Sequence, residues 1–262
     1  MDSKIGLEIV KNIECKGKKV GDYYYDEETD TLSFSLPYPF PCKFAVVGLE
    51  KILVTPAMLK LPTFLKYHNI DWLRQQLMQL KLIQQDKLLL HGSAWFGKNN
   101  QGYLAVGFPD SGKTTRVLKE VVNKGAKYCS DENVIVDKNL WCYPIERKTS
   151  LSYWLAKQVN YSLTFRQRIE YVIARVKHKL CPLFEPNIWV DLPYKRYDFK
   201  LHNLIYLTEG KGKSLLTLTN NEFPFYTNPV IQTYCYASGW NIESIYNKYK
   251  KLILEVEKHA TN

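Results

Sequence analysis

Apolar and polar positions alternate along the chain with two different periods. Residues 31–36 follow the period of two that is typical of a half-buried strand, whereas residues 71–85 and 163–180 have apolar side chains at helical spacing. Short apolar runs predict further strands at 4–10, 44–47, 88–91, 103–106, 134–136, 141–143, 188–191, 204–207 and 215–218. Residues 113–123 and 241–259 are predicted to form two more helices. Within 163–180 six residues form one continuous apolar stripe: Phe165, Ile169, Val172, Ile173, Val176 and Leu180.

The order of these elements indicates a mixed α/β fold. Strands cluster before and after residues 107–114, and only a few long helices lie between them. This arrangement favours a mixed sheet with helices packed on it over a strictly alternating βαβ chain. We expect a β-rich N-terminal region over residues 1–68 and a second domain over residues 69–262.

The composition is that of a soluble globular protein, with 45% hydrophobic and 24% charged residues. No segment has the uninterrupted apolar length of a membrane-spanning helix, and the first residues lack the apolar stretch of a signal peptide. We therefore expect a cytoplasmic protein with no membrane partner. The six cysteines include no Cys-x-x-Cys pair, which argues against a zinc site and a disulfide framework.

The net charge of +10 leaves nucleic acid open as a partner. A basic surface attracts polyanions such as nucleotides and RNA, but it is equally compatible with an ordinary solvated surface. Arg168, Arg175 and Lys179 share one face of the 163–180 helix, which we place opposite the apolar stripe. That face is either a binding surface for an acidic substrate such as RNA or a solvated helix face. A homo-oligomer is compatible with the sequence.

Residues 107–114 match the pattern G-x-x-x-x-G-K-[ST]. In this pattern backbone N–H groups form an anion site at a helix N-terminus, the lysine reaches the β- and γ-phosphates, and the hydroxyl reaches Mg²⁺. An apolar strand leads into the segment, and a helical pattern that ends at Gly125 follows it. We therefore predict a site for a nucleoside triphosphate, ATP with Mg²⁺, formed by Gly107, Asp110, Ser111, Gly112, Lys113, Thr114 and Thr115.

The adjacent acids Asp131 and Glu132 follow Gly125, where a strand over residues 127–130 should return along the loop. A kinase needs a base for the acceptor hydroxyl and a carboxylate that holds the metal opposite the loop threonine. Two adjacent acids on a strand point in opposite directions unless the backbone bends, so one could face the acceptor and the other the metal. The alternative is a solvated turn. Asp137 and Asp191 each end an apolar run, and Asp191 is the stronger alternative metal carboxylate for an ordinary P-loop NTPase.

Residues 88–137 resemble the catalytic core of the HPr kinase/phosphorylase family and, more distantly, ATP-dependent phosphoenolpyruvate carboxykinases. The shared order is Leu90-His91-Gly92, the 107–114 loop, a helix that ends at Gly125, the paired acids, and the apolar strand 134–136. The helix is one residue longer here than the family pattern. The resemblance implies a P-loop-containing mixed β-sheet core of this type with flanking helices.

The resemblance also implies a role for individual residues. Asp131 takes the position of the general base, and Glu132 takes the metal-side position, where the family usually has aspartate. His91 would lie beside the transfer site, although a histidine at a strand end is also an ordinary core residue. Arg147, within Glu146-Arg147-Lys148, would stabilise charge on the transferring phosphoryl group or be a surface arginine.

These observations predict an ATP-dependent kinase that transfers the γ-phosphate to a hydroxyl acceptor. The acceptor could be a protein serine, a small metabolite or a ribose hydroxyl of RNA. The alternative is a nucleotide-binding switch or NTPase without a phosphoryl acceptor.

Overall fold

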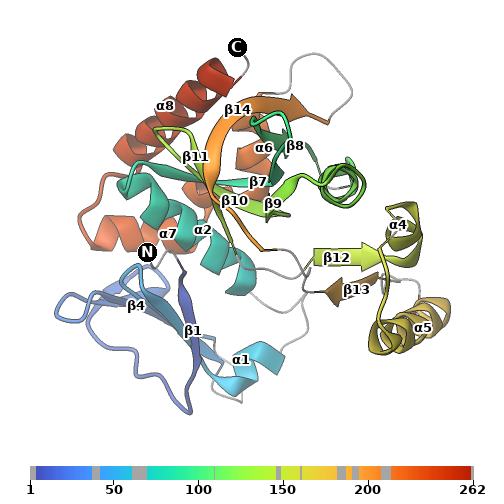
Figure 1. The fold of residues 1–262 in the computed structure, drawn as a ribbon. Coiled ribbons are helices and arrows are strands. Elements are labelled where there is room, and N and C mark those ends of the chain that lie inside the picture. Colours follow the sequence, from blue (N-terminus) through green and yellow to red (C-terminus); the bar gives the residue numbers. More distant parts are fainter. Residues whose placement is uncertain are drawn as a thin grey trace. The chain divides into compact units, whose positions relative to one another are not determined.

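The computed structural model describes residues 4–36, 42–60, 70–108, 110–145, 149–159, 161–181, 187–190, 195–207 and 214–260 (Figure 1). These residues form three β-sheets and eight α-helices, which confirms the mixed α/β class. The contacts divide the chain into two compact units. Unit 1 contains Met1–Leu88 and Thr219–Leu252, and unit 2 contains Leu89–Leu218 and Ile253–Asn262. The boundary that we expected after residue 68 therefore falls within the first segment of unit 1.

A six-stranded sheet forms the β-rich part of unit 1, in the order β1-β6-β5-β4-β3-β2. Its first two neighbours, β1 and β6, are parallel, and the other pairs are antiparallel. The side chains of Leu32, Phe34, Phe44, Val46 and Ile52 are buried; β6 alternates buried and half-buried positions, whereas β4 and β5 are buried on both faces at their centres. The strands are β1 (Gly6–Ile9), β2 (Lys18–Val20), β3 (Tyr23–Asp26), β4 (Thr31–Ser35), β5 (Lys43–Val47) and β6 (Lys51–Val54).

Helices complete unit 1. They are α1 (Pro56–Lys60), α2 (Ile70–Gln84), α7 (Pro229–Ala237) and the first part of α8 (Ile242–Ala260), with a 3₁₀ turn η3 (Phe225–Thr227). Asn228 caps α7, because its side chain accepts a hydrogen bond from the Val230 N–H at 2.9 Å. Tyr234 of α7 and Tyr25 of β3 both donate to the Asp30 carboxylate, at 2.6 and 2.8 Å, and so connect helix and sheet.

The main sheet of unit 2 has the strand order β10-β11-β14-β8-β7-β9, and β10 pairs with β7 as well. The central strand β8 is parallel to β14 and antiparallel to β7. The strands are β7 (Lys87–Phe96), β8 (Gly102–Val106), β9 (Lys127–Ser130), β10 (Asn133–Asp137), β11 (Trp141–Pro144) and β14 (Phe199–Tyr206). This arrangement confirms the predicted mixed sheet on both sides of residues 107–114.

The helix that follows residues 107–112 covers this sheet. It begins as α3 (Lys113–Leu118), continues as the π-helical turn η2 (Lys119–Asn123), and is followed by Gly125 in the left-handed conformation, φ +67°. Val117 and Leu118 pack in one buried cluster with Trp95, Ala105 and Tyr128. The end of β8 and the start of α3 are thereby fixed by the core.

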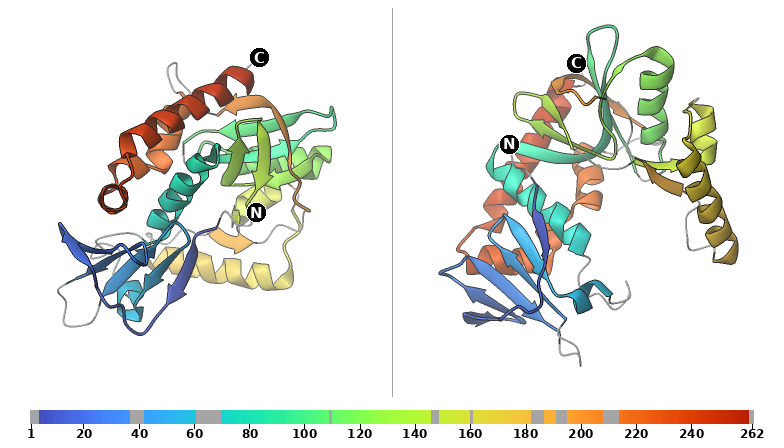
Figure 2. Two further views of the ribbon diagram at one scale, coloured as in Figure 1. Left: turned by 90° about the vertical axis from the view of Figure 1, so that its left-hand side faces the viewer. Right: turned by 60° about the horizontal axis from the view of Figure 1, so that its bottom comes forward.

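A second part of unit 2 consists of the antiparallel strands β12 (Thr149–Ser152) and β13 (Asn187–Val190) with α4 (Tyr153–Gln158) and α5 (Phe165–Leu180). Figures 1 and 2 show α4 and α5 beside this strand pair. Thr164 and Gln167 form a reciprocal capping box, which explains where α5 begins. The predicted helix is confirmed, but the six residues of its apolar stripe are 46–82% exposed, so the stripe does not face a core.

The strand that we predicted at 215–218 is wrong, because these residues begin helix α6 (Leu215–Glu222). Its buried residues Leu215, Leu218 and Thr219 follow the helical spacing i, i+3, i+4. The Ser214 hydroxyl accepts a hydrogen bond from the Thr217 N–H and caps the helix. A four-residue apolar run does not distinguish a strand from one turn of a buried helix. In the described ranges no helix has the length and apolar character needed to cross a membrane.

Candidate functional site

The 107–114 segment connects β8 to α3, as predicted. Backbone geometry explains its two glycines. A Cβ on Gly107 would overlap the Ser111 side chain, and Gly112 has φ +88°, which only glycine adopts without strain. Asp110 has φ +62°, and the Ser111 N–H donates to the Phe108 carbonyl at 3.2 Å. The described residues of the segment therefore form a tight loop immediately before a helix.

Lys113 lies folded back over this loop. Its side-chain Nζ donates to the carbonyl oxygens of Gly107 and Phe108, at 2.9 and 2.8 Å, and the residue is only 6% exposed. The Ser111 hydroxyl is also buried, and the described part of the chain offers it no hydrogen-bond partner. A cation and a buried hydroxyl thus lie at the loop, where an anion could accept hydrogen bonds from both.

Asp131 is the buried acid of the site, with 3% exposure. Its Oδ1 accepts two hydrogen bonds, from Ser93 Oγ at 2.5 Å and from Thr114 Oγ1 at 3.2 Å. Thr114 is the hydroxyl residue of the loop motif, so the acid and the loop are in direct contact. The other oxygen, Oδ2, is buried and has no hydrogen-bond partner of standard geometry within the described ranges.

Burial raises the pKa of Asp131 above its ordinary value, because the charged form loses its hydration. Hydrogen bonding from Ser93, Thr114 and the Glu132 N–H opposes this effect, and Thr149 lies close enough to lower the pKa further. A buried carboxyl group with a raised pKa beside a lysine-containing loop is typical of functional sites.

Glu132 lies at a bend between β9 and β10. Its φ is +70°, and its carbonyl oxygen accepts a hydrogen bond from the Gly92 N–H at 3.0 Å. Because the backbone bends here, the two acids occupy different environments: Asp131 is buried and Glu132 is half-buried. The solvated-turn interpretation does not fit Asp131.

His91 lies in β7, immediately before Gly92, which pairs with Val106 at the end of β8. Side chains in a strand alternate, so His91 is on the same side of β7 as Ser93, which contacts Asp131. His91 is half-buried. Strand β7 therefore links the loop, the acids and His91.

The remaining residues that we predicted for the site do not all lie at the loop and the paired acids. Thr115 follows Thr114 in the first turn of α3 and is half-buried. Asp137 caps the β10–β11 hairpin, since its carboxylate accepts hydrogen bonds from the N–H groups of Asn139 and Trp141 and from the Tyr143 hydroxyl. Arg147 and Asp191 lie outside the described residues.

Two residues of the site, Ser93 and Thr149, were missed by the sequence analysis. Ser93 lies two positions after His91 and shares its face because β7 continues to Phe96, whereas we predicted a strand that ended at His91. Thr149 opens β12, which was not predicted as a strand, so no local pattern indicated its position.

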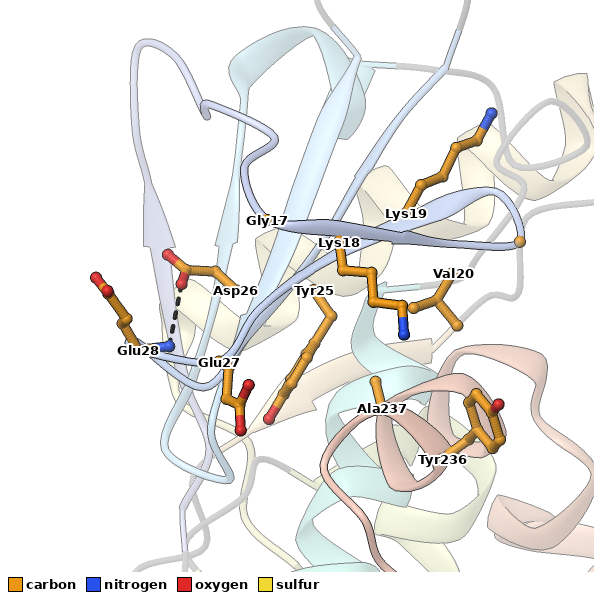
Figure 3. Close-up of a pocket in the computed structure, with 11 residues that line it drawn as sticks. Gly17, Lys18, Lys19, Val20, Tyr25, Asp26, Glu27, Glu28, Tyr236 and Ala237 are labelled. Carbon is orange, nitrogen blue, oxygen red and sulfur yellow. Dashed lines mark hydrogen bonds between the residues drawn. The ribbon is translucent and has the colours of Figure 1, made fainter.

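Two hollows lie away from the loop residues. One of about 400 Å³ in unit 2 is lined by Trp95, Tyr103 and Arg116 among others, and Arg116 pairs there with Glu120 at 3.3 Å. The other, of about 720 Å³, belongs to unit 1 (Figure 3). It is lined by Gly17, Lys18, Lys19, Val20, Gly21, Tyr25, Asp26, Glu27, Glu28, Tyr236 and Ala237. Neither hollow includes a residue of the 107–114 loop or the paired acids.

No protein-family model matches this chain, and no curated protein matches its sequence significantly.

Proposed function

We propose that this protein is an ATP-dependent phosphotransferase that transfers the γ-phosphate of ATP to a hydroxyl acceptor. The single observation that carries the proposal is the hydrogen bond from Thr114 to the buried Asp131. A glycine-rich turn without a ligand has no need of a buried carboxylate against its hydroxyl residue, because burial of that charge is unfavourable. A phosphate-binding loop does need a carboxylate there, opposite its metal-binding hydroxyl.

The residues present fit a triphosphate with magnesium. Three features of the loop are suited to binding an anion: Gly107 has no Cβ, the Ser111 hydroxyl is buried, and Lys113 lies over the loop. Among the described residues no three His, Cys, Asp or Glu side chains form a metal-binding group. Magnesium would therefore take Thr114 and a carboxylate from the protein, and phosphate and water oxygens for the rest. A bound magnesium ion would neutralise charge on the phosphates.

In this proposal the residues of the site have separate roles. Lys113 exchanges its two carbonyl partners for oxygens of the β- and γ-phosphates. Asp131 accepts the proton of the acceptor hydroxyl at Oδ2, which makes no hydrogen bond of standard geometry within the described residues. Glu132 lies on the metal side, and His91 lies beside the acceptor. Arg147, outside the described residues, keeps the charge-stabilising role that the resemblance implies.

The Thr114 contact also supports an exchange of roles between the two acids, with Asp131 on the metal side and Glu132 as the base. Asp131→Asn and Glu132→Gln separate the two assignments. Loss of the base lowers the transfer rate by orders of magnitude and leaves the Mg²⁺ requirement unchanged. Loss of the metal carboxylate raises the Mg²⁺ concentration needed for half-maximal rate.

We further propose that unit 2 is a core of the HPr kinase type. The elements of unit 2 follow the order of that family pattern: β7, the 107–114 loop, α3, Gly125, the paired acids and β10. The helix has one residue more than the family pattern, and the π-helical turn at Lys119–Asn123 offers a place for it, because a π turn holds one residue more per hydrogen-bonded ring than an α turn.

Transfer of label from [γ-³²P]ATP tests the proposal. Purified protein is incubated with labelled ATP and cell extract, with Lys113→Gln as the inactive control. Label on a defined macromolecule or metabolite supports a transferase, and protease or ribonuclease treatment then distinguishes protein, RNA and small-molecule acceptors. Release of inorganic phosphate alone would indicate an NTPase or a nucleotide-binding switch and would contradict the proposal of a transferase.

A further inference from the structure

Helix α5 presents its apolar stripe to solvent. None of its residues is buried, and the stripe residues lie within about 100° of one another around the helix axis. The opposite face holds the half-buried residues Tyr171 and Ala174, and α5 packs there against β13. A contiguous exposed apolar patch of this kind marks an interaction surface.

Cations border the stripe along both edges. At about 100° of rotation per residue, Arg168, Arg175 and Lys179 lie along one edge, and Arg166 and Lys177 lie along the other. The first three residues therefore flank the stripe, and our expectation that they lie opposite it is wrong. The one carboxylate of α5, Glu170, is paired with Arg166 at 2.9 Å. The surface thus combines an apolar centre with positive borders.

This combination excludes two partners on physical grounds. Nucleic acid requires cations or stacking aromatic side chains at the centre of the contact, whereas the centre here is mostly Val and Ile. A second copy of α5 packed antiparallel would bring Arg168 against Arg175 of its partner, a like-charge contact. Neither partner uses both the stripe and its borders.

An anionic phospholipid surface would contact both the apolar stripe and its positive borders. Its acyl boundary accommodates an apolar stripe, and its headgroups attract cations along the two borders. The stripe has no polar side chain that would recognise a particular shape, which suits a fluid surface.

We infer that α5 binds the surface of an anionic phospholipid membrane and lies in the plane of that surface. The inference rests on the stripe and the cations of α5, is independent of phosphoryl transfer, and replaces our expectation of no membrane partner. It concerns a helix that lies on a membrane and not one that crosses it.

Vesicle co-sedimentation of the full chain tests the inference. Vesicles of phosphatidylcholine with about one third phosphatidylserine should bind the protein, pure phosphatidylcholine should bind it at least about tenfold more weakly, and salt should weaken binding. Val172→Glu should lower the partition coefficient at least about tenfold. Leu254→Glu on α8 is the matched control, because Leu254 is 58% exposed and Val172 is 59% exposed. Circular dichroism verifies that both variants fold.

A second pair of variants tests the charged borders. Arg168→Gln with Arg175→Gln should lower vesicle affinity about tenfold or more, since each cation near the surface contributes about fivefold. Lys200→Gln with Lys251→Gln removes the same charge from exposed positions elsewhere and should have little effect. Equal binding to both vesicle types, or equal losses in test and control variants, would overturn the inference. So would binding of single-stranded RNA, unaffected by Val172→Glu, in place of binding to vesicles.

Discussion

The hydrogen bond between Ser93 and Asp131 is the contact of the site whose removal is easiest to interpret. Ser93→Ala deletes the hydroxyl that donates to Oδ1 at 2.5 Å and keeps the Cβ, so the pairing of Ser93 with Ala105 in the sheet is preserved. Both partners are buried, so water does not replace the lost donor readily. After the substitution, Thr114 at 3.2 Å is the remaining side-chain hydroxyl on Oδ1.

The size of the effect follows from the charge and the burial. A hydrogen bond to a charged group contributes about 1.5–3 kcal/mol. Burial raises the pKa of Asp131, and the Ser93 contact is the largest of those that lower it, so the variant should raise this pKa further. If Asp131 is the base, about 1.5–3 kcal/mol less stabilisation of its ionised form lowers kcat about tenfold to a hundredfold at pH values below the pKa of Asp131, where the ionised form is the minor one.

The assay is the pH dependence of basal ATP hydrolysis by the purified protein, and of transfer when an acceptor is known. The acidic limb of kcat should move to higher pH in Ser93→Ala, while KM for ATP changes little, because Ser93 is not part of the loop. Ser33→Ala is a control, since it removes another buried strand hydroxyl, whose partner is the Tyr24 carbonyl in unit 1. A lower kcat with an unmoved pH profile, or the same loss in Ser33→Ala, would show that the effect is packing and would refute the reasoning.

Three further substitutions test the loop and the acid. Lys113→Gln should weaken ATP binding at least about tenfold in calorimetry, because it removes the loop cation; unchanged affinity would contradict our interpretation of the loop. Gly107→Ala should also weaken ATP binding, because its Cβ meets the Ser111 side chain, and Ser111→Gly in the same chain should restore part of the affinity. Asp131→Asn should raise Tm at neutral pH. The folded-state pKa of Asp131 is raised, so its contribution to stability is fully present below the unfolded pKa of about 3.9 and is lost as the pH rises through the folded value. The gain in Tm should therefore vanish in acid, and a lower Tm at neutral pH would be evidence against an unfavourable buried charge.

Local patterns were sufficient for the loop and its neighbours. The strand before Gly107, the helix after Gly112 and the cap at Gly125 each follow from residues adjacent in sequence. Periodicity likewise identified α5, but it reports only which face of a helix is apolar. Whether anything covers that face depends on distant segments, and in α5 the face is exposed.

Contacts between distant strands were not predictable in the same way. Ser93 meets Asp131 because β7 pairs antiparallel with β9, with Ala94 opposite Ser130. This register is set by the whole sheet and not by either strand alone. The sequence analysis therefore identified the acid but not the hydroxyl that holds it.

The contact between Thr114 and Asp131 reconciles the two roles proposed for this acid. A hydroxyl that donates its proton to Oδ1 directs its lone pairs elsewhere, so the bond at 3.2 Å orients the threonine oxygen as a metal ligand. The same bond engages only Oδ1, and among the described residues Oδ2 makes no hydrogen bond of standard geometry that would compete with the proton of an acceptor. One carboxylate can thus position the metal-binding hydroxyl with one oxygen and act as a base with the other. Substitution at Thr114 distinguishes this dual role from a direct Asp131–metal bond, because only in the dual role does Thr114→Val alter both the Mg²⁺ requirement and the pH dependence of the rate.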